Sequence, residues 1–191
     1  MDPVRQLVAR SQQNDLQAFE DLITRYQDRV FTLCRQLTGN HTDAQDLSQE
    51  VFVKAYFNLA SFRFEADFGT WLHRIAVNQW LNFKRKKGIL ASVSLDEPIH
   101  TDQGEMAREV ASDTMTPEEA YEKEETRRLV HQAMQKISPE HRMVLVLREF
   151  NEMSYEDLAA VLDCSLGTVK SRLNRARQSL KEEIEKLNRV K

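Results

Sequence analysis

The side chains best suited to chemistry in this sequence gather between residues 166 and 181, and the chemistry they suit is recognition of DNA. Five cations and no anion lie between Thr168 and Lys181. Hydroxyl, amide and cationic groups share the outer arc and flanks of a predicted helix, at Thr168, Lys170, Ser171, Arg172, Asn174, Arg175, Arg177 and Gln178. Such groups hydrogen-bond base edges in a major groove and neutralise phosphates. A solvated surface helix could have the same composition. The position of this helix in the fold must therefore distinguish DNA binding from simple solvation.

This helix is predicted to be the second of a helix-turn-helix. Ser154 begins the first helix, with Asp157 at the position of a weak capping box. Residues 163–167 interrupt the helical period before the second helix. Apolar residues then recur at steps of three and four, at Val169, Leu173, Ala176 and Leu180. A buried seam opposite a polar arc favours a recognition helix over a merely solvated one, but does not identify the class of regulator.

A second group of candidate residues combines aromatic rings with cations between residues 61 and 87. The stretch 61–70 breaks the helical period yet holds three phenylalanines. The candidates in the stretch and in the helix after it are Phe62, Arg63, Phe64, Phe68, Trp71, Asn78, Asn82, Lys84 and Arg85. Rings that stack on bases and cations that follow a backbone are typical of single-strand binding. The alternative, core aromatic residues with cations that complement a helix C-terminus, has equal support from composition.

Hydrophobic periodicity predicts the helices that position these groups. A short helix comes first, and a long helix follows from Asn14 and ends before Gly39. Two further helices are expected, one from Thr42 to Leu59 and one from Thr70 to Lys87.

Two more helix starts precede the helix-turn-helix. Thr116 and Glu119 can form a capping box, Ser138-Pro139 is a second start signal, and Ile184 and Leu187 extend the last helix. The expected fold is all-α, with two small helical domains at 1–87 and 117–191. The second domain has four helices and ends in the helix-turn-helix.

Residues 88–116 between these domains are predicted to be a flexible acidic linker. The net charge of −3 conceals a segregation, since residues 88–126 carry two cations and eleven anions while both ends are mildly basic. The stretch lacks a hydrophobic period and contains Pro98 and Gly104.

The remaining reactive residue types predict no catalytic or metal site. Cys34 and Cys164 have no partner at motif spacing, which indicates reduced structural thiols. The five histidines are scattered rather than at ligand spacing, and no glycine-rich phosphate loop is present. We therefore expect no enzyme and no cofactor. No apolar run is long enough to span a bilayer, so we expect a cytoplasmic protein without direct membrane insertion.

Three motifs in order resemble the extracytoplasmic-function (ECF, group IV) sigma factors of the sigma-70 family. Residues 43–56 resemble region 2.2, residues 68–78 resemble regions 2.3–2.4, and residues 147–159 with 167–176 resemble region 4.2. The order, the spacing and a chain without room for regions 1.1 and 3 agree with this class. Gly69 and Asn174 depart from residues common in the class, which leaves the promoter sequence open.

The resemblance implies a protein that joins core RNA polymerase and directs it to promoters. The helix at 42–59 would dock on the β′ coiled coil through Asp46, Gln49, Glu50 and Lys54, and the second domain would meet the β flap. Residues 61–87 would melt and hold the −10 element, and the recognition helix would bind the −35 element as duplex. The resemblance also implies control by an anti-sigma factor, often membrane-anchored, that responds to a stress signal.

Two rival functions are compatible with parts of the sequence. A repressor or activator that binds duplex DNA unaided explains residues 154–181, but not the aromatic stretch or the acidic linker. A helical adaptor for acidic proteins would leave the arc of Ser171, Asn174 and Arg175 without a purpose. Co-purification with core polymerase separates the three functions.

Overall fold

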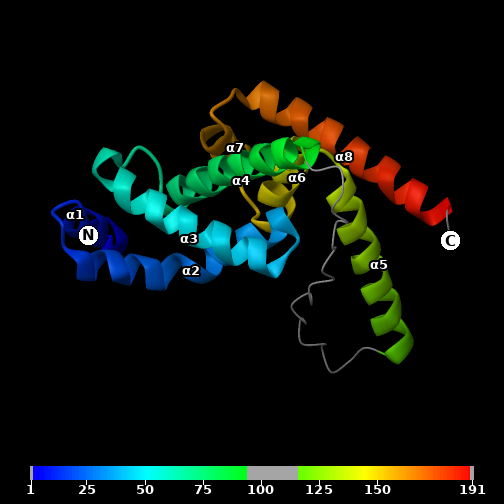
Figure 1. The fold of residues 1–191 in the computed structure, drawn as a ribbon, viewed down its shortest axis with the longest axis horizontal. Helices are drawn as coiled ribbons and strands as arrows, with labels where there is room; N and C mark the ends of the chain where they lie inside the picture. The colour runs from blue at the N-terminus through cyan, green and yellow to red at the C-terminus, as the bar shows by residue number, and fades with distance from the viewer. Residues whose placement is uncertain (1, 94–115, 190–191) are drawn as a thin grey trace.

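Every regular element in the described part of the chain is helical, which confirms the predicted all-α class. The computed structural model describes residues 2–93 and 116–189. The first part contains α1 (Pro3–Ser11), α2 (Leu16–Thr38), α3 (His41–Asn58), the 3-10 turn η1 (Leu59–Ser61) and α4 (Phe68–Val93). The second part contains α5 (Pro117–Lys136), α6 (Pro139–Leu145), the π-helical turn η2 (Val146–Phe150), α7 (Tyr155–Leu162) and α8 (Leu166–Arg189) (Figure 1).

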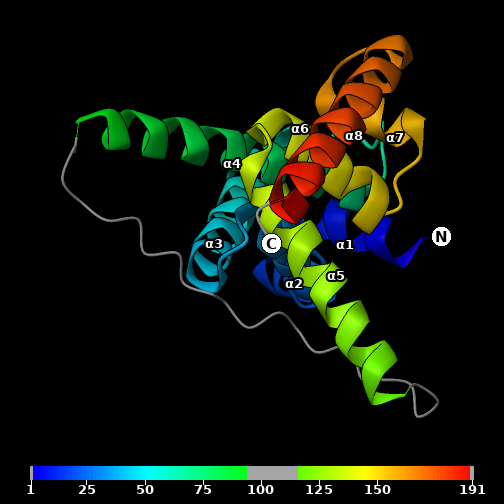
Figure 2. The ribbon, with the colours of Figure 1, turned by 90° about the vertical axis from the view of Figure 1, so that its right-hand side faces the viewer.

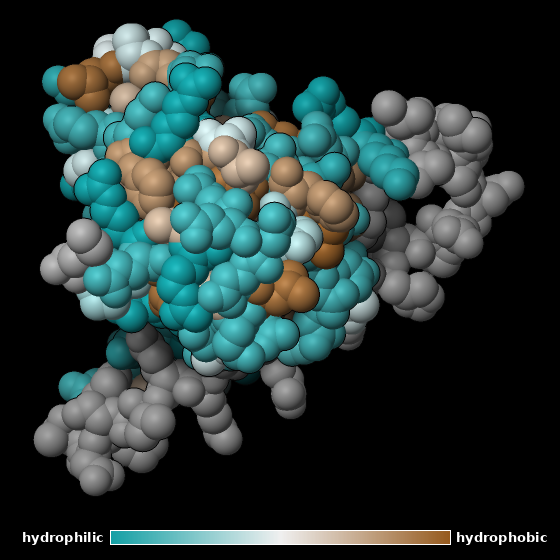
Figure 3. Space-filling view, turned by 90° about the vertical axis from the view of Figure 1, so that its left-hand side faces the viewer, coloured by the Kyte–Doolittle hydropathy of each residue, from teal (hydrophilic) through white to brown (hydrophobic). Residues whose placement is uncertain are grey.

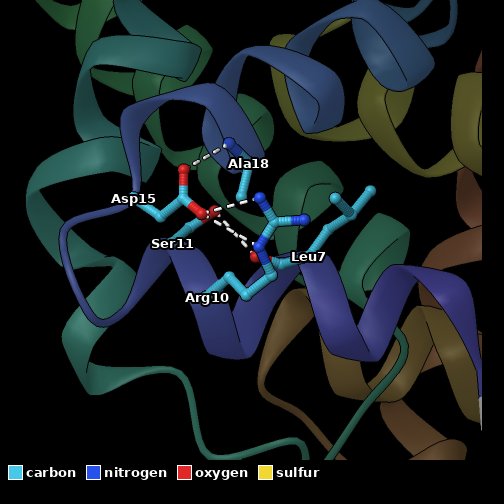
Figure 4. A network of polar contacts seen from close by, with 5 residues as sticks. All are labelled: Leu7, Arg10, Ser11, Asp15 and Ala18. Atoms are coloured by element: carbon cyan, nitrogen blue, oxygen red, sulfur yellow. Dashed lines mark hydrogen bonds and ion pairs between the residues drawn. The ribbon is translucent and has the colours of Figure 1, made fainter.

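The turn between α1 and α2 shows how local side chains fix a helix start. Asn14 was expected to begin α2, but its φ of 65° places it in the turn, and Asp15 is the cap. The Asp15 carboxylate accepts a hydrogen bond of 3.1 Å from the Ala18 amide and an ion pair of 2.7 Å from Arg10 (Figure 4). The amide bond first, and Arg10 next, lower the pKa of Asp15. The cap therefore depends on an ionised carboxylate.

Helices α3 and α4, in contrast, begin earlier than their sequence signals suggested. Asn40 caps α3 through a 2.9 Å bond from the Asp43 amide, ahead of Thr42. Asp67 accepts hydrogen bonds from the Gly69 and Thr70 amides at 2.8 and 3.3 Å, so α4 begins before Thr70. Asn and Asp are better N-caps than threonine, and their short side chains place an oxygen within reach of the amides two or three residues later.

The far end of α4 differs from the expected domain boundary. The helix runs to Val93, six residues beyond Lys87, because a single glycine at 88 weakens a helix by about 1 kcal/mol without ending it. The rest of the expected linker, residues 94–115, lies outside the described residues. At its other side the predicted capping box is confirmed, with Thr116 and Glu119 exchanging hydrogen bonds of 2.9 and 3.3 Å.

The core of the first domain lies between α2, α3 and α4. Helix α2 packs along α3, and α4 contacts both. The contacting faces are the apolar stripes predicted from periodicity, and Leu33, Leu47, Leu72 and Trp80 are fully buried at their centre. Since α3 and α4 are held on the same core, the polar faces they turn outward keep fixed positions relative to each other.

The helices from α5 to α8 pack on one another and also on the helices of residues 2–93, and the buried residues of both parts form one continuous hydrophobic cluster. Helix α8 lies against α5, α6 and α7, while α7 contacts α4 and η2 contacts α2. Figure 2 shows the end of α4 and the beginning of α5 projecting from this common body in different directions. The two expected domains are therefore joined by a packed interface in addition to the chain between them.

Polar contacts across this interface meet the C-terminal end of α2. Buried Arg142 donates a 3.3 Å bond to the Leu37 carbonyl oxygen, and Asn151 donates a 3.0 Å bond to Gln36 Oε1. Gly39, with φ of +73°, ends α2, and a Cβ there would come within 2.0 Å of the Gln135 amide nitrogen. The left-handed backbone favours glycine at this position, and a larger residue would also have to displace the end of the Gln135 side chain. Burial lowers the pKa of Arg142 to about 10, and its placement beside free helix carbonyls is favourable because they carry partial negative charge.

Candidate nucleic-acid interface

The recognition helix predicted from sequence is the first half of α8. Val169, Leu173 and Ala176 are buried, as the apolar seam predicted. On the other side, Lys170, Ser171, Asn174, Arg175, Arg177 and Gln178 are exposed, while Thr168 and Arg172 are half-buried. Ser165 begins the helix, because its hydroxyl oxygen accepts a 3.2 Å bond from the Thr168 amide. The fold thus presents the predicted arc to solvent on a helix anchored along its opposite side.

Individual side chains on this arc are not equally free. The side chains of Asn174 and Arg175 make no hydrogen bond within the described chain and can turn toward a base edge. Gln178 donates a 2.8 Å bond to Glu182, one turn further along α8. Arg177 is bound to Glu149 of η2 by two hydrogen bonds, of 2.7 and 3.2 Å. The side chains at the centre of the arc are therefore free to turn, while Arg177 and Gln178 at its edge are held by hydrogen bonds.

The aromatic residues of the 61–70 stretch are mostly part of the core. Phe62, Phe68 and Trp71 are each at most 6% exposed. Their rings lie 5.1 to 5.6 Å from one another, centroid to centroid, and Tyr26 of α2 meets Phe68 at 5.3 Å. Unpacking these rings to stack on a base would forfeit this burial. Their burial favours, for these three residues, the alternative that they are core aromatic residues rather than direct contacts with DNA.

Phe64 is the member of this group that the fold leaves accessible. It is half-buried, has a φ of 59°, and its ring lies 4.9 Å below the guanidinium of Arg5. The ring borders a pocket of about 110 Å³, to which the N-cap residue Asp2, Arg5 of α1 and Asp67 of the loop also contribute. The sequence carried no signal for Arg5, because only tertiary folding brings α1 under this loop. Arg63, the remaining loop candidate, is exposed.

The candidates on α4 lie along its outer side. Asn78, Asn82 and Arg85 are exposed, and Lys84 is half-buried. Arg85 donates a 2.6 Å bond to the Asn82 amide oxygen, which leaves the Asn82 NH₂ as a donor for another acceptor. The structure therefore brings an amide and cationic surface onto the helix that follows the aromatic loop.

The four expected docking residues, Asp46, Gln49, Glu50 and Lys54, are all exposed on α3. Two exposed apolar residues continue the same side of this helix, Val53 at 54% and Phe57 at 76% exposure. Figure 3 shows the end of the molecule formed by α1, the start of α2 and the end of α3, where apolar side chains interrupt a polar surface. Val53 and Phe57 were not predicted as part of this surface, although their spacing of three and seven residues from Glu50 places them on its face.

The cysteines and the potential metal ligands of the described residues form no further candidate site. Cys34 is buried, which raises its pKa to about 12, and Cys164 is a free thiol in the helix-turn-helix turn. Within residues 2–93 and 116–189, no three histidine, cysteine or acidic side chains are grouped to bind a metal. None of the helices in these ranges combines the length and apolar character needed to cross a membrane.

Family comparisons agree with this arrangement of surfaces. Residues 22–89 match the family described as Sigma-70 region 2, and residues 127–180 match the family described as Sigma-70, region 4. The first match covers α3, the aromatic loop and nearly all of α4. The second covers the helix-turn-helix with its recognition arc.

Curated relatives and solved structures match along almost the whole chain. The ECF RNA polymerase sigma-E factor of Escherichia coli (strain K12) is 37% identical, over 96% of this chain and 95% of its own length. RNA polymerase sigma-H factor of Pseudomonas aeruginosa is 36% identical, over 97% and 95%. The structure of CnrH in complex with the cytosolic domain of CnrY matches with a TM-score of 0.65 at 26% identity, over 96% of this chain and 98% of that one. The sigma factor RpoE of Bartonella quintana, solved with the anti-sigma factor NepR, also has a TM-score of 0.65 at 26% identity, over 87% and 96%. The two family matches and the relatives similar along almost the whole chain show that the chain belongs to the ECF sigma factors of the sigma-70 family.

Proposed function

We propose that this sigma factor binds core RNA polymerase, recognises the −35 element as duplex through α8, and holds a melted −10 element between the 61–70 loop and α4. The observation that carries the proposal is the division of surfaces on one fold. A polar arc suited to a major groove lies on α8, while rings, amides and cations suited to unpaired bases lie on α4 and its loop. The division also favours a sigma factor over a regulator that binds only duplex DNA.

In the duplex-binding half, Asn174 and Arg175 are the residues we assign to base edges. Their exposed side chains are not committed to other groups in the described chain. An amide pairs well with adenine, and a guanidinium pairs well with guanine. Lys170 and Arg172 lie at the flanks and suit phosphates, which position the helix without selecting a sequence.

In the single-strand half, we assign the pocket beneath Phe64 to a base removed from the stack. Phe64 offers a ring face, Arg5 a cation and Asp67 a hydrogen-bond acceptor at this pocket. Capturing one extruded base offsets part of the few kcal/mol that unstacking costs. Asn78 and Asn82 on α4 then serve the neighbouring nucleotides.

The partners follow from the remaining surfaces and from the relatives. The α3 face, with Asp46, Gln49, Glu50 and Lys54, is assigned to the β′ coiled coil of core polymerase, and the second domain to the β flap. CnrH and RpoE were solved with CnrY and with the anti-sigma factor NepR, respectively. We assign this chain an anti-sigma factor too, membrane-anchored and released by a stress signal.

Transcription with purified components tests the proposed function. The full chain is added to core polymerase with a library of promoter fragments, and run-off products are sequenced. We expect products that start at fixed distances from two shared sequence elements and that require both proteins. Binding of the chain to the same duplexes without core, and no core-dependent transcript, would instead support an unaided regulator.

A Phe64→Gly variant tests the single-strand half. Glycine accepts the positive φ of this position without strain, so the change removes the ring and spares the backbone. We expect fewer open complexes, with core binding and −35 binding retained. A template mismatched across the −10 element should restore much of the lost transcription. Glu65→Gln, an exposed change in the same loop, is the matched control. Absence of rescue in a folded, core-bound variant would show that the loop does not act in strand opening.

A further inference from the structure

We propose that Glu149 limits the binding of this sigma factor to DNA of the wrong sequence, because it occupies Arg177 on the recognition helix. Glu149 lies on η2 and Arg177 on α8, 28 residues apart. One carboxylate oxygen accepts hydrogen bonds from both Nη2 and Nε of Arg177, at 2.7 and 3.2 Å. The proposal rests on the proposed binding of duplex DNA by α8.

The surroundings of the pair make Arg177 its specific partner. Arg148, the neighbouring cation, donates a 2.6 Å bond to the Met153 carbonyl oxygen and stacks at 5.1 Å over the Tyr155 ring. It is thereby directed toward the start of α7. The bond to Glu149 first, and Tyr155 as a smaller cause, raise the pKa of Arg177. Glu149 thus fixes the orientation of one cation at the edge of the recognition arc.

This pairing matters for selectivity because phosphates are the same in every sequence. A mobile cation on α8 would neutralise a phosphate on any duplex and raise affinity for all sequences alike. In the pair, the negative charge of Glu149 offsets the positive charge of Arg177. Two nitrogens of the Arg177 guanidinium already donate to the Glu149 carboxylate. The remaining donors of Arg177, on Nη1 and the outer side of Nη2, are held in place relative to η2 by these two bonds. A contact between Arg177 and a phosphate therefore depends on how α8 is seated in the groove.

Glu149 is consequently a positioning residue. We expect its loss to change the affinity for DNA rather than the stability of the fold. Both side chains are about half exposed, at 52% and 47%. Exposed ion pairs of this kind contribute little to stability. We expect Glu149→Ala to leave the melting temperature almost unchanged while it increases the affinity for unrelated DNA.

The test uses the full chain bound to core polymerase and two fluorescent duplexes. One duplex is enriched from a random pool by the wild-type complex, and the other is a scrambled version. Dissociation constants are measured between 0.05 and 0.3 M KCl for wild type, Glu149→Ala, Arg177→Ala and the double variant. We expect Glu149→Ala to bind the scrambled duplex about fivefold more tightly at moderate salt. The slope of log K against log salt should steepen by about 0.9, the value for one extra phosphate contact. The preference for the enriched duplex should fall.

The double variant and a nearby acidic residue separate pairing from general charge. In the Arg177→Ala background, Glu149→Ala should have no further effect on the slope. Glu152 is exposed and three residues from Glu149, so Glu152→Ala removes the same charge without freeing Arg177. An equal effect of Glu152→Ala, or an effect of Glu149→Ala that persists without Arg177, overturns the inference. Failure of the wild-type complex to prefer the enriched duplex would instead contradict the proposed −35 function.

Discussion

At the scale of single residues, Arg175 separates sequence recognition from general attraction to DNA. Its exposed guanidinium lies at the centre of the recognition arc. We expect Arg175→Ala to weaken binding to the preferred −35 duplex by about 1–3 kcal/mol and to relax preference at one base pair. Competition binding on preferred and scrambled duplexes measures both effects.

Arg189→Ala is the matched control for this prediction. Arg189 is exposed on the same helix, about 21 Å further along its axis at 1.5 Å per residue. Its loss removes the same charge but should leave base preference intact. An equal fall on both duplexes for Arg175→Ala would make it a phosphate contact rather than a base contact.

Histidine burial predicts a pH dependence of stability. Burial first, and then Arg142, Arg35 and Arg127, lower the pKa of His131 below its ordinary value of 6.5. Burial also lowers the pKa of His73. Both groups bind protons more readily when unfolded, so their contribution to stability is fully present above pH 6.5. It declines as the pH falls from 6.5 through the pKa of the folded state. Urea unfolding between pH 5 and 8 measures this decline.

A glutamine at either histidine cannot gain the proton and provides the control. His131→Gln should make the unfolding free energy flatter between pH 6.5 and 5, whereas His41→Gln, on an exposed position, should not. Unchanged curvature in the His131→Gln and His73→Gln variants would place the pH dependence on other groups.

At the scale of elements, α3 shows how one helix can stabilise the fold and bind a partner. One side buries Ala44, Leu47 and Val51, while the other exposes Glu50 and Phe57. The expected docking surface is thus both acidic and apolar, which suits a partner helix with basic and apolar residues.

Charge reversal on this face tests docking without disturbing the core. Glu50→Lys should abolish binding to core polymerase, while the stability changes by no more than about 0.5 kcal/mol because the position is exposed. Phe57→Ser should also weaken binding, since 76% of this side chain is exposed and available to a partner. Asp28→Lys makes the same charge change on an exposed site of α2 and should have no effect. Pull-down and thermal unfolding of the same samples distinguish a docking role from a structural one.

At the scale of the whole molecule, the two proposed DNA-binding surfaces lie too close together to reach both elements of one promoter at once. Helix α7 packs on α4, and the recognition arc begins six residues after α7 ends at Leu162. Elements at −35 and −10 are 25 base pairs apart by name, about 85 Å along B-DNA at 3.4 Å per step. The 22 residues between Val93 and Thr116 can extend to roughly 75 Å. Simultaneous recognition of both elements therefore requires the bonds of Arg142 and Asn151 to the end of α2 to break.

Distance measurements between spin labels test this separation. Labels are placed at exposed Asp28 on α2 and Glu140 on α6. Cys164 is replaced by serine, and Cys34 can remain because it is fully buried with a raised pKa. We expect one short distance in the free chain and a distance longer by tens of ångströms in the complex with core polymerase and promoter. The same short distance in both samples would contradict domain separation.

The sequence by itself determined the helices, their buried stripes and the recognition arc. These follow from periodicity, because apolar residues at steps of three and four must share a face and be covered. The opposite arc with Asn174 and Arg175 was for the same reason predictable as exposed. Cap positions were predicted less well, because Asp15, Asn40 and Asp67 lie within three residues of the expected starts and can make the same local bonds.

Only the tertiary structure decided which of the candidate groups are available to a ligand. Phe62 and Phe64 are alike in the sequence, yet packing against Trp71 buries the first ring, while the second, between Phe62 and Arg5, stays half-buried. Arg175 and Arg177 are equally cationic, yet Glu149 from another element occupies only Arg177. Contacts between elements far apart in the chain depend on how the helices pack. The helix propensity and hydrophobic period of each segment therefore do not predict them. The docking of the second domain on the end of α2 was decided at this level for the same reason.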